Sequence, residues 1–565
     1  MRDTTTRVRS TAVRASHTLL MRSRRYGRRL RRRLRRRWLA ATPQQRQTAR
    51  VTAGSAALGL VVAVTAVAAA GPWDSGQRTA ELSRAAEQGR AGTPHGPGGG
   101  RTGISAAPRV LTPLGSGEDG APGANSPRGG GGSQGGGRTG GAGPGSAGAT
   151  PVPERAALAD TLEPLLKDGG LGRLRTGSVL DVTTGRRLFG TKQDTPATPA
   201  STVKLATATA ALSAAGPDSR ISTRTVRGQH GEVVLVGGGD PTLSARGLDA
   251  LARSTAHALR GHGGKTHGGG HGADSRRISL RYDTSLYSGR TRHPIGTNDN
   301  IAPVTPLMVD EGRKGGSGGA PETSAEGPGD GPSPRSADPA ADAAHSFAEA
   351  LRKHGVRVSG APHKAQAPRH APKLAVHRSA PLSALVERML THSDNDIAEA
   401  LARRTALAAG EPASFAGGAK AVRGRLDKLR LPLHGVHLAD GSGLDRHDKV
   451  TASLLSRLLV RAAAPERAGL RAVLTGLPVA HFTGTLDGRY KDREGGVGAG
   501  LVRAKTGTLT GVNTLAGTVV DADGRLLAFA FMTAGTTDKN AAQDSLDRLA
   551  AALADCGCHD SPSAG

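Results

Sequence analysis

The sequence predicts an α+β, multidomain protein whose ordered part begins near residue 153. Strand-like runs joined by short turns predict a β-hairpin near the start of this part and another near its end, and helix-like apolar spacing predicts helices around them. The 565 residues include 82 Gly and 33 Pro but only 2 Trp, 4 Tyr and 6 Phe, so part of the chain cannot form a packed core. Two cysteines exclude a disulfide-dense scaffold and a four-thiolate zinc site.

The N-terminal region predicts a single membrane span. The formal net charge is +29, and residues 1–50 hold 17 Arg and one acidic residue, whereas residues 51–71 carry no charged side chain. An apolar helix of this length rises about 30 Å, which is the thickness of the hydrocarbon core of a bilayer. The positive-inside rule makes residues 1–50 a cytoplasmic tail and places the rest of the chain outside the cytoplasmic membrane.

Two alternatives remain for this region. The Arg-rich tail could bind nucleic acid, but neither stacking aromatics nor a groove-reading helix accompanies it, so we expect no nucleic-acid partner. The Ala-Val-Ala run at residues 66–68 resembles a signal cleavage site, and cleavage there would release a secreted protein. The basic leader is long for a cleaved signal, which favours an uncleaved anchor.

Composition divides the rest of the chain. Residues 72–150 are predicted to be a disordered linker, because 22 of residues 91–150 are Gly and few are apolar. Histidines within residues 260–274 lack regular spacing and an orienting carboxylate, so we expect no metal site there. The predicted domains are a larger one formed by residues 151–222 and 378–556, one or more inserted smaller, mainly-β domains with low-complexity loops at residues 223–377, and a tail at residues 557–565.

Periodic segments within the ordered part predict its elements. Apolar residues spaced as on one helix face predict helices over residues 158–166, 382–390, 397–401 and 546–553. Apolar runs on either side of short turns predict hairpins over residues 178–189 and 514–532. Cys556 and Cys558 are expected to be two terminal thiols, and a small-ring disulfide or a metal site with His559 are the alternatives.

A serine and a lysine one helical turn apart form the first candidate catalytic pair. Ser201 and Lys204 open an uncharged segment rich in Ala, Thr and Leu, which predicts a helix buried on most sides. Residues three apart lie on one helix face, so the hydroxyl and the amine can meet. Burial lowers the pKa of a lysine because the charged form loses its solvation, and the neutral amine can then take the serine proton. The pair therefore predicts an activated nucleophile.

Two more motifs follow along the chain: Ser393-Asp394-Asn395 between two predicted helices, and Lys505-Thr506-Gly507-Thr508 before the terminal hairpin. A strand edge at the last motif would present hydroxyls, backbone N–H groups and an ammonium to an extended peptide that ends in a carboxylate. Gly507 would let the substrate backbone approach closely.

The three motifs, in this order, are those of class A β-lactamases and penicillin-binding proteins. The chain resembles in particular the class C low-molecular-mass penicillin-binding proteins, which are exported D-alanyl-D-alanine carboxypeptidases that double as endopeptidases. The long gap between the first two motifs resembles that group's inserted domains, and the Asp-Gly-Ser-Gly-Leu run at residues 440–444 is a further match. The resemblance covers about residues 153–556 and implies a β-lactamase/transpeptidase-like catalytic domain, an antiparallel sheet flanked by helices. Unlike the family, residues 293–300 have no aromatic side chain.

The resemblance also implies catalytic roles. Ser201 would be acylated, Lys204 would act as its base, and Ser393 would relay a proton to the leaving amine. The backbone N–H groups of Ser201 and Thr508 would form the oxyanion hole.

Substrate-binding roles are implied in the same way. Asn395 would hold the peptide carbonyl of the substrate, and Lys505 would raise the positive potential. Thr506 and Thr508, on either side of Gly507, would bind the terminal carboxylate. The resemblance implies neither a metal nor an organic cofactor.

The sequence thus predicts a serine-type D-Ala-D-Ala carboxypeptidase and D,D-endopeptidase that acts on peptidoglycan stem peptides and is acylated by β-lactams. One alternative is a β-lactamase of the same fold, which would need a general base for fast deacylation that the sequence does not reveal. The other is a non-catalytic penicillin-binding cell-wall or sensor protein, which the intact Lys204, Ser393 and Lys505 disfavour.

Overall fold

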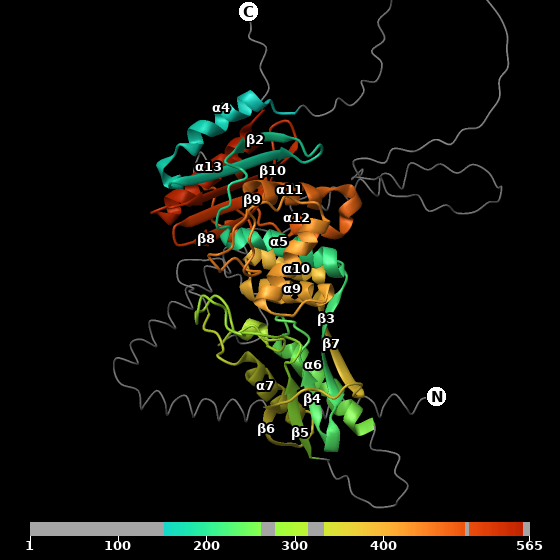
Figure 1. Ribbon diagram of the computed structural model, residues 1–565. Helices are drawn as coiled ribbons and strands as arrows, with labels where there is room; N and C mark the ends of the chain where they lie inside the picture. The colour runs from blue at the N-terminus through green and yellow to red at the C-terminus, as the bar shows by residue number, and fades with distance from the viewer. Residues whose placement is uncertain (1–151, 262–276, 315–332, 492–495, 558–565) are drawn as a thin grey trace, which may run out of the picture. The chain divides into compact units, whose positions relative to one another are not determined.

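The computed structural model describes residues 152–261, 277–314, 333–491 and 496–557, which form two five-stranded sheets with helices packed on them (Figure 1). The predicted basic tail, membrane span and linker at residues 1–50, 51–71 and 72–150 lie outside these residues. None of the described helices is long and apolar enough to cross a membrane.

The first sheet is antiparallel and has the strand order β2-β1-β10-β9-β8. Both predicted hairpins are confirmed, since β1 pairs with β2 and β9 with β10. The pairing of β1 with β10 joins the two hairpins into one sheet, although they lie at opposite ends of the described chain. The strands are β1 (Leu174–Asp181), β2 (Arg187–Thr191), β8 (Val502–Leu509), β9 (Val512–Val520) and β10 (Leu526–Ala534).

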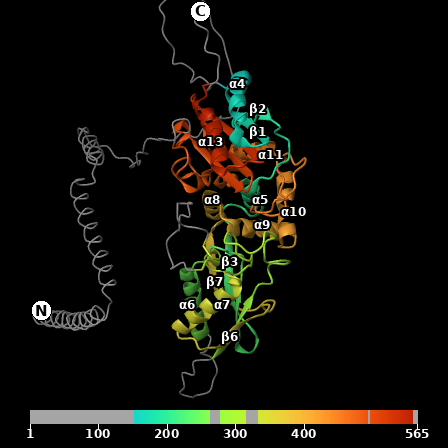
Figure 2. The ribbon, with the colours of Figure 1, turned by 90° about the vertical axis from the view of Figure 1, so that its left-hand side faces the viewer.

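The central strand β10 supplies apolar side chains to both faces of this sheet. Leu527, Phe529 and Phe531 point into one core and Ala528 and Ala530 into the other, because side chains alternate along a strand. The first core is closed by α4 (Arg155–Leu166) and α13 (Lys539–Asp555), which pack against each other (Figures 1 and 2). Helices at both ends of the described chain therefore cover one face.

The small side chains of the opposite face lie against a helical layer. Its centre is α5 (Lys204–Ala215), which is buried continuously from Lys204 to Leu212. The buried hydroxyls of α5 have partners: Thr207 Oγ1 donates to the Gly441 carbonyl at 2.7 Å and Thr209 Oγ1 to the Leu205 carbonyl at 2.8 Å. The Ala- and Thr-rich helix can therefore be buried without loss of hydrogen bonds. The surrounding helices are α8 (Leu382–His392), α9 (Asn395–Ala409), α10 (Phe415–Lys428), α11 (Ala452–Ala463) and α12 (Ala472–Thr475).

The second sheet corrects the prediction of a mainly-β insert. It is mixed, with order β6-β5-β4-β3-β7 and parallel pairs β4–β5 and β5–β6, and two helices share a core with one of its faces. Leu248 and Leu251 of the first helix, and Phe347 and Leu351 of the second, lie three or four residues apart, so the sequence contains the helical spacing that the prediction overlooked. The elements are β3 (Arg220–Arg227), β4 (Val233–Val236), α6 (Ala245–Gly261), β5 (Ile278–Asp283), α7 (Pro339–Lys353), β6 (Val358–Lys364) and β7 (Lys373–Pro381).

The domain boundaries stay a prediction. The expected limits at residues 223 and 377 fall within β3 and β7, which pair with each other as antiparallel strands. Short 3-10 helices complete the fold at Gly169–Leu171, Ala200–Val203, Gln229–Gly231, Asp310–Gly312, Pro465–Leu470, Gly484–Leu486 and Gly496–Gly498.

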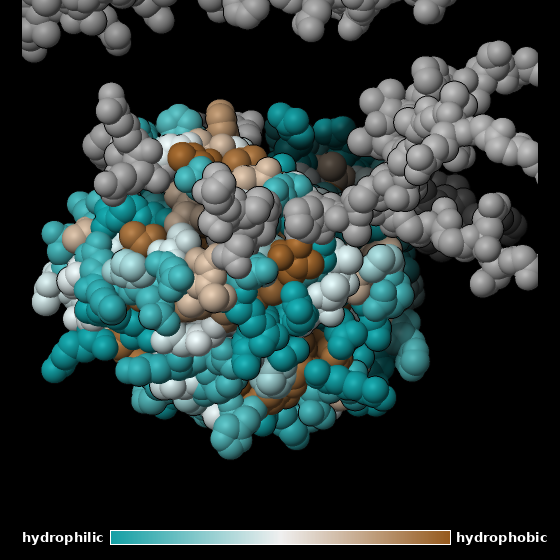
Figure 3. Space-filling model, turned by 90° about the horizontal axis from the view of Figure 1, so that it is seen from above, coloured by the Kyte–Doolittle hydropathy of each residue, from teal (hydrophilic) through white to brown (hydrophobic). Residues whose placement is uncertain are grey.

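The described part of the face seen in Figure 3 is mainly hydrophilic. The face seen in Figure 3 shows hydrophobic side chains in small, separate groups, as expected for a surface that exposes few large apolar residues. Near the C-terminus, Cys556 is disulfide-bonded, so the expectation of a free thiol at this position is wrong.

Candidate active site

Ser201 and Lys204 meet as the sequence predicts. Ser201 lies in the 3-10 turn Ala200–Val203, and Lys204 begins α5 directly after it. The Lys204 Nζ donates to Ser201 Oγ at 2.9 Å, to Asn395 Oδ1 at 2.7 Å and to the Ser442 carbonyl at 2.7 Å. A protonated lysine has three N–H donors, so each of them has an acceptor. Lys204 has 0% exposure, whereas Ser201 is partly exposed.

The charge of Lys204 is set by two opposing effects. Burial lowers its pKa from 10.5 to about 8, while the nearby carboxyl groups of Asp440, Asp394 and Glu399 oppose this shift. The direction agrees with the sequence prediction, but an amine with a pKa of about 8 is still about nine-tenths protonated at pH 7. The expectation of a fully neutral amine is therefore too strong. The reactive free base is a minor form at neutral pH.

The second motif lies where α8 meets α9. Ser393 ends α8 in the left-handed conformation (φ 58°, ψ 33°), and the Asp394 carboxylate caps α9 by accepting the Ile397 N–H at 2.8 Å. This turn places Asn395 at the first position of α9, within hydrogen-bonding distance of Lys204. Ser393 is partly exposed, and no hydrogen bond among the described residues joins its hydroxyl to Ser201 or Lys204.

The third motif lies on β8, the edge strand of the first sheet. Lys505 is completely buried and donates from Nζ to the Thr506 carbonyl at 2.8 Å. Burial and the neighbouring charge of Lys204 lower the pKa of Lys505 well below its usual value. The Thr506 hydroxyl donates to Thr485 Oγ1 at 2.8 Å, whereas Thr508 is exposed at the strand edge.

Gly507 brings β8 against the turn that carries Ser201. A Cβ atom at this position would lie 2.6 Å from the Pro199 carbonyl oxygen and 3.1 Å from the Ser201 nitrogen. The Thr514 hydroxyl of the neighbouring strand also donates to the Pro199 carbonyl, at 2.7 Å. The expected reason for this glycine, close approach by substrate, is thus joined by another: close approach by the protein's own backbone.

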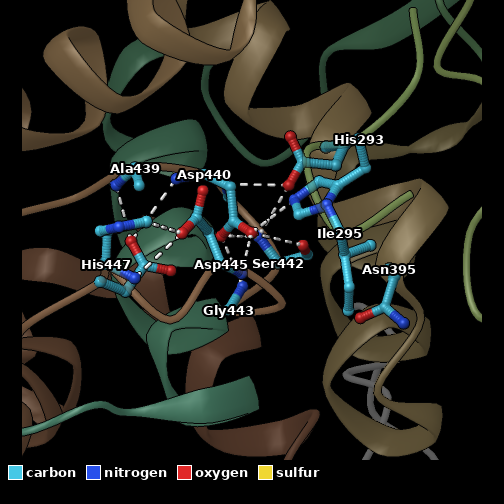
Figure 4. A network of polar contacts seen from close by, with 12 residues as sticks. His293, Ile295, Asn395, Ala439, Asp440, Ser442, Gly443, Asp445 and His447 are labelled. Atoms are coloured by element: carbon cyan, nitrogen blue, oxygen red, sulfur yellow. Dashed lines mark hydrogen bonds and ion pairs between the residues drawn. The ribbon is translucent and has the colours of Figure 1, made fainter.

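A buried polar network behind Lys204 was not predicted from the sequence. Figure 4 shows Asp440 at its centre. The Asp440 carboxylate accepts the N–H groups of Ser442 at 3.0 Å and Gly443 at 2.6 Å, and its Oδ2 lies 2.8 Å from His293 Nε2. Glu399 Oε1 accepts the Ser442 N–H as well, at 3.0 Å. The network holds the loop whose Ser442 carbonyl accepts from Lys204. The Asp-Gly-Ser-Gly run was the available signal, since an Asp before small residues favours such a turn.

Two aspartates of this network, Asp440 and Asp448, differ in their protonation at neutral pH. Hydrogen bonds from His293 and backbone N–H groups outweigh burial and lower the pKa of Asp440 to about 2. Burial beside that charge raises the pKa of Asp448 to about 10. Ligand-type atoms of His293, Glu399 and Asp440 lie within 4.8 Å of one another, but these atoms already bond to each other or accept backbone N–H groups.

The chain matches a known protein family over nearly all of its described residues. The chain matches the D-Ala-D-Ala carboxypeptidase 3 (S13) family over residues 158–331 and 317–555. The chain belongs to the S13 family. As an S13 family member it is a serine-type D-Ala-D-Ala carboxypeptidase, which favours this hypothesis over the β-lactamase and non-catalytic alternatives.

Curated relatives of this S13 carboxypeptidase carry matching names. It is 37% identical to a carboxypeptidase of Mycobacterium tuberculosis over 73% of this chain and 88% of the relative, and 38% identical to carboxypeptidase DacB of Mycolicibacterium smegmatis over 73% and 86%. A D-alanyl-D-alanine carboxypeptidase of Actinomadura is 30% identical over 72% of this chain and 86% of its own length.

The solved structures support the fold of this S13 carboxypeptidase. Penicillin-binding protein 4 of Haemophilus influenzae superimposes with a TM-score of 0.54 at 24% identity and covers 70% of this chain and 97% of its own. The same protein in complex with a β-lactam gives a TM-score of 0.52 at 25% identity, with coverage of 69% and 97%. The penicillin-binding-protein/β-lactamase-like α+β fold expected from the motifs is therefore confirmed.

Proposed function

We propose that Ser201 is the nucleophile of this carboxypeptidase and Lys204 its general base. The observation that carries this proposal is the 2.9 Å hydrogen bond between Lys204 Nζ and Ser201 Oγ beside a partly exposed serine. When Lys204 loses a proton, its nitrogen gains a lone pair into which the serine hydroxyl can donate. Ser201 Oγ then bonds to the carbonyl carbon of the penultimate D-Ala, and the serine proton passes to Lys204.

The tetrahedral intermediate next expels terminal D-alanine. The backbone N–H groups of Ser201 and Thr508 would stabilise the oxyanion, and each such donor typically contributes about 3 kcal/mol. As the C–N bond breaks, the proton that Lys204 took from Ser201 would pass to the leaving amine through the Ser393 hydroxyl, which gives up its own proton and receives that of Lys204. Water then hydrolyses the acyl ester on Ser201, which restores the free serine and releases the shortened stem peptide.

Substrate recognition is assigned to Asn395 and the edge of β8. Asn395 would hold the peptide carbonyl, while Thr506 and Thr508 would bind the terminal carboxylate beside Gly507. The exposure of Thr508 at an edge strand supports this role, because an extended peptide can pair with the free side of such a strand. Lys505 would add positive potential when protonated.

Endopeptidase activity, β-lactam acylation and location complete the proposal. A D,D-cross-link presents the same D-Ala carbonyl with a larger leaving amine, so the same residues would cleave it. The β-lactam complex of the H. influenzae protein supports acylation of Ser201 by β-lactams. The basic and apolar segments at residues 1–71 support an anchored chain whose catalytic part lies outside the cytoplasmic membrane, where peptidoglycan is found.

One assay tests the reaction directly. The purified full chain is incubated with a diacyl-L-Lys-D-Ala-D-Ala peptide, and free D-alanine is measured. We expect release by the wild type and none by Ser201→Ala. A wild type that takes up fluorescent penicillin on Ser201 but releases no D-alanine would instead favour a penicillin-binding sensor. A cross-linked muropeptide dimer as substrate measures the endopeptidase activity, and protease treatment of intact cells tests the location.

A further inference from the structure

The direction in which the Asn395 amide faces is set by two different partners. Its Oδ1 accepts from Lys204 Nζ at 2.7 Å, and its Nδ2 donates to the backbone carbonyl of Asn300 at 3.0 Å. If the amide were rotated by half a turn, its NH₂ group would face the donor Lys204 and its oxygen would face the Asn300 carbonyl. The Asn300 carbonyl therefore selects the orientation in which Asn395 serves Lys204.

Asn300 belongs to a segment of the insert, residues 298–302, that one arginine holds in place. Arg335 Nε donates to the carbonyl of Asp299, and its Nη1 donates to the carbonyl of Glu311, both at 3.1 Å. Its Nη2 lies 3.2 Å from Oδ2 of Asp396, the residue after Asn395. A single planar guanidinium thus joins the residue before Asn300 to the residue after Asn395.

The Arg335–Asp396 contact of this junction is buried, whereas Asp299 and Asn300 are exposed. The side chains of Arg335 and Asp396 are 7% and 0% exposed. Asp396 Oδ1 also accepts the N–H of Ala302 at 2.9 Å, so this carboxyl group holds the same segment at a second point. Burial raises the pKa of Asp396 to about 8, so its charge is only partial at neutral pH. Loss of Arg335 is costly because it leaves buried acceptors of this junction without their hydrogen-bonding partner.

We propose that Arg335 is a positioning residue of the carboxypeptidase, which fixes the Asn395 amide toward Lys204 by holding Asn300 at hydrogen-bonding distance. The inference rests on the proposed function of the site. It assigns a catalytic consequence to the insert, since Arg335 and Asn300 both lie outside the three motifs. Arginine is required because lysine cannot present a planar fork to three acceptors at once.

The test compares three variants of the full chain. Arg335→Gln removes the charge and the fork, and Arg335→Lys keeps the charge but loses the fork. Arg281→Gln is the matched control, because Arg281 of β5 forms an ion pair with Glu232, the residue before β4, with 2.9 Å between Nη2 and Oε1. No hydrogen bond or ion pair among the described residues joins this pair to the residues of the site. The measured quantities are the rate constant and the final stoichiometry of acylation by fluorescent penicillin, together with kcat and KM for D-alanine release.

We expect Arg335→Gln and Arg335→Lys to slow acylation by about tenfold or more, because a displacement of about 1 Å in an active site can lower the reaction rate by at least this factor. Stoichiometry should stay near one label per chain, and kcat should fall more than KM rises. A merely structural role would lower the labelled fraction and leave the rate constant of the labelled fraction unchanged. If Arg335→Gln fails to fold, Arg335→Lys decides: acylation at the wild-type rate would overturn the proposal.

A crystal structure of the slower variant gives an independent answer. Hydrogen bonds of this kind are about 2.7–3.2 Å long. In the variant, the distance from Asn395 Nδ2 to the Asn300 carbonyl oxygen should therefore exceed about 3.5 Å. Alternatively, the Asn395 amide should be rotated so that its NH₂ group faces Lys204. An unchanged contact would refute the inference. Failure of the proposed function is distinguishable, because the wild type itself would then not be acylated.

Discussion

The pKa of Lys204 makes a quantitative prediction for acylation of Ser201. Burial lowers this pKa to about 8, and only the free amine can accept the serine proton. The free-amine fraction is then about 1% at pH 6, about 9% at pH 7 and about 90% at pH 9. The acylation rate constant should therefore rise about tenfold between pH 6 and pH 7, about 90-fold between pH 6 and pH 9, and level off above pH 9.

The assay measures the rate of labelling by fluorescent penicillin between pH 6 and pH 9.5, with circular dichroism as a check of folding. Asp396 needs a control, because burial raises its pKa to about 8 as well. Asp396→Asn removes that titration, and we expect slower labelling with the same midpoint. A rate that does not change with pH, or one that still rises about tenfold per pH unit at pH 9.5, would refute the assignment of a buried lysine base.

Three further predictions concern single residues. Ser201→Ala should abolish penicillin labelling and change the free energy of unfolding by less than about 1 kcal/mol, because Lys204 keeps two acceptors; label on another residue would contradict the nucleophile assignment. Gly507→Ala should destabilise the protein by about 1–3 kcal/mol and slow penicillin labelling, because the new Cβ atom would lie 2.6 Å from the Pro199 carbonyl oxygen. A wild-type melting temperature and a wild-type labelling rate would show that β8 does not depend on this close approach. Asp440→Asn should cost about 3 kcal/mol in urea unfolding, because His293 and two backbone N–H groups lose a buried carboxylate, and a neutral effect would show that the network does not need this charge.

Local patterns in the sequence predicted the motif residues and most helices of the catalytic part. Ser201 and Lys204 are three residues apart, so helix geometry alone places them together. The hairpins were predictable because each is formed by neighbouring strands around a short turn.

Contacts between distant residues were out of reach of such patterns. His293 meets Asp440 across 147 residues, and Lys204 meets the Ser442 carbonyl across 238. The first contact depends on a buried histidine whose neighbours show no periodicity, and the second on a backbone atom, which has no signature in a sequence. The helices α6 and α7 were missed although Leu248 and Leu251 of α6, and Phe347 and Leu351 of α7, are spaced as on one helix face and are buried in one core. Burial of Lys204 was predicted, but the carboxyl groups that keep much of its proton in place were not.

The order of strands in the first sheet has a consequence for biosynthesis. The middle strand, β10, is the last one made, and Leu174 pairs with Ala534. A ribosome that stops before Leu526 has already produced every side chain proposed for hydrolysis, yet the sheet then lacks the strand that joins β9 to β1. Such pairings over long stretches of chain also form slowly. We therefore expect the chain to become active only when its synthesis is nearly finished, and fragments that lack β10 to be inactive.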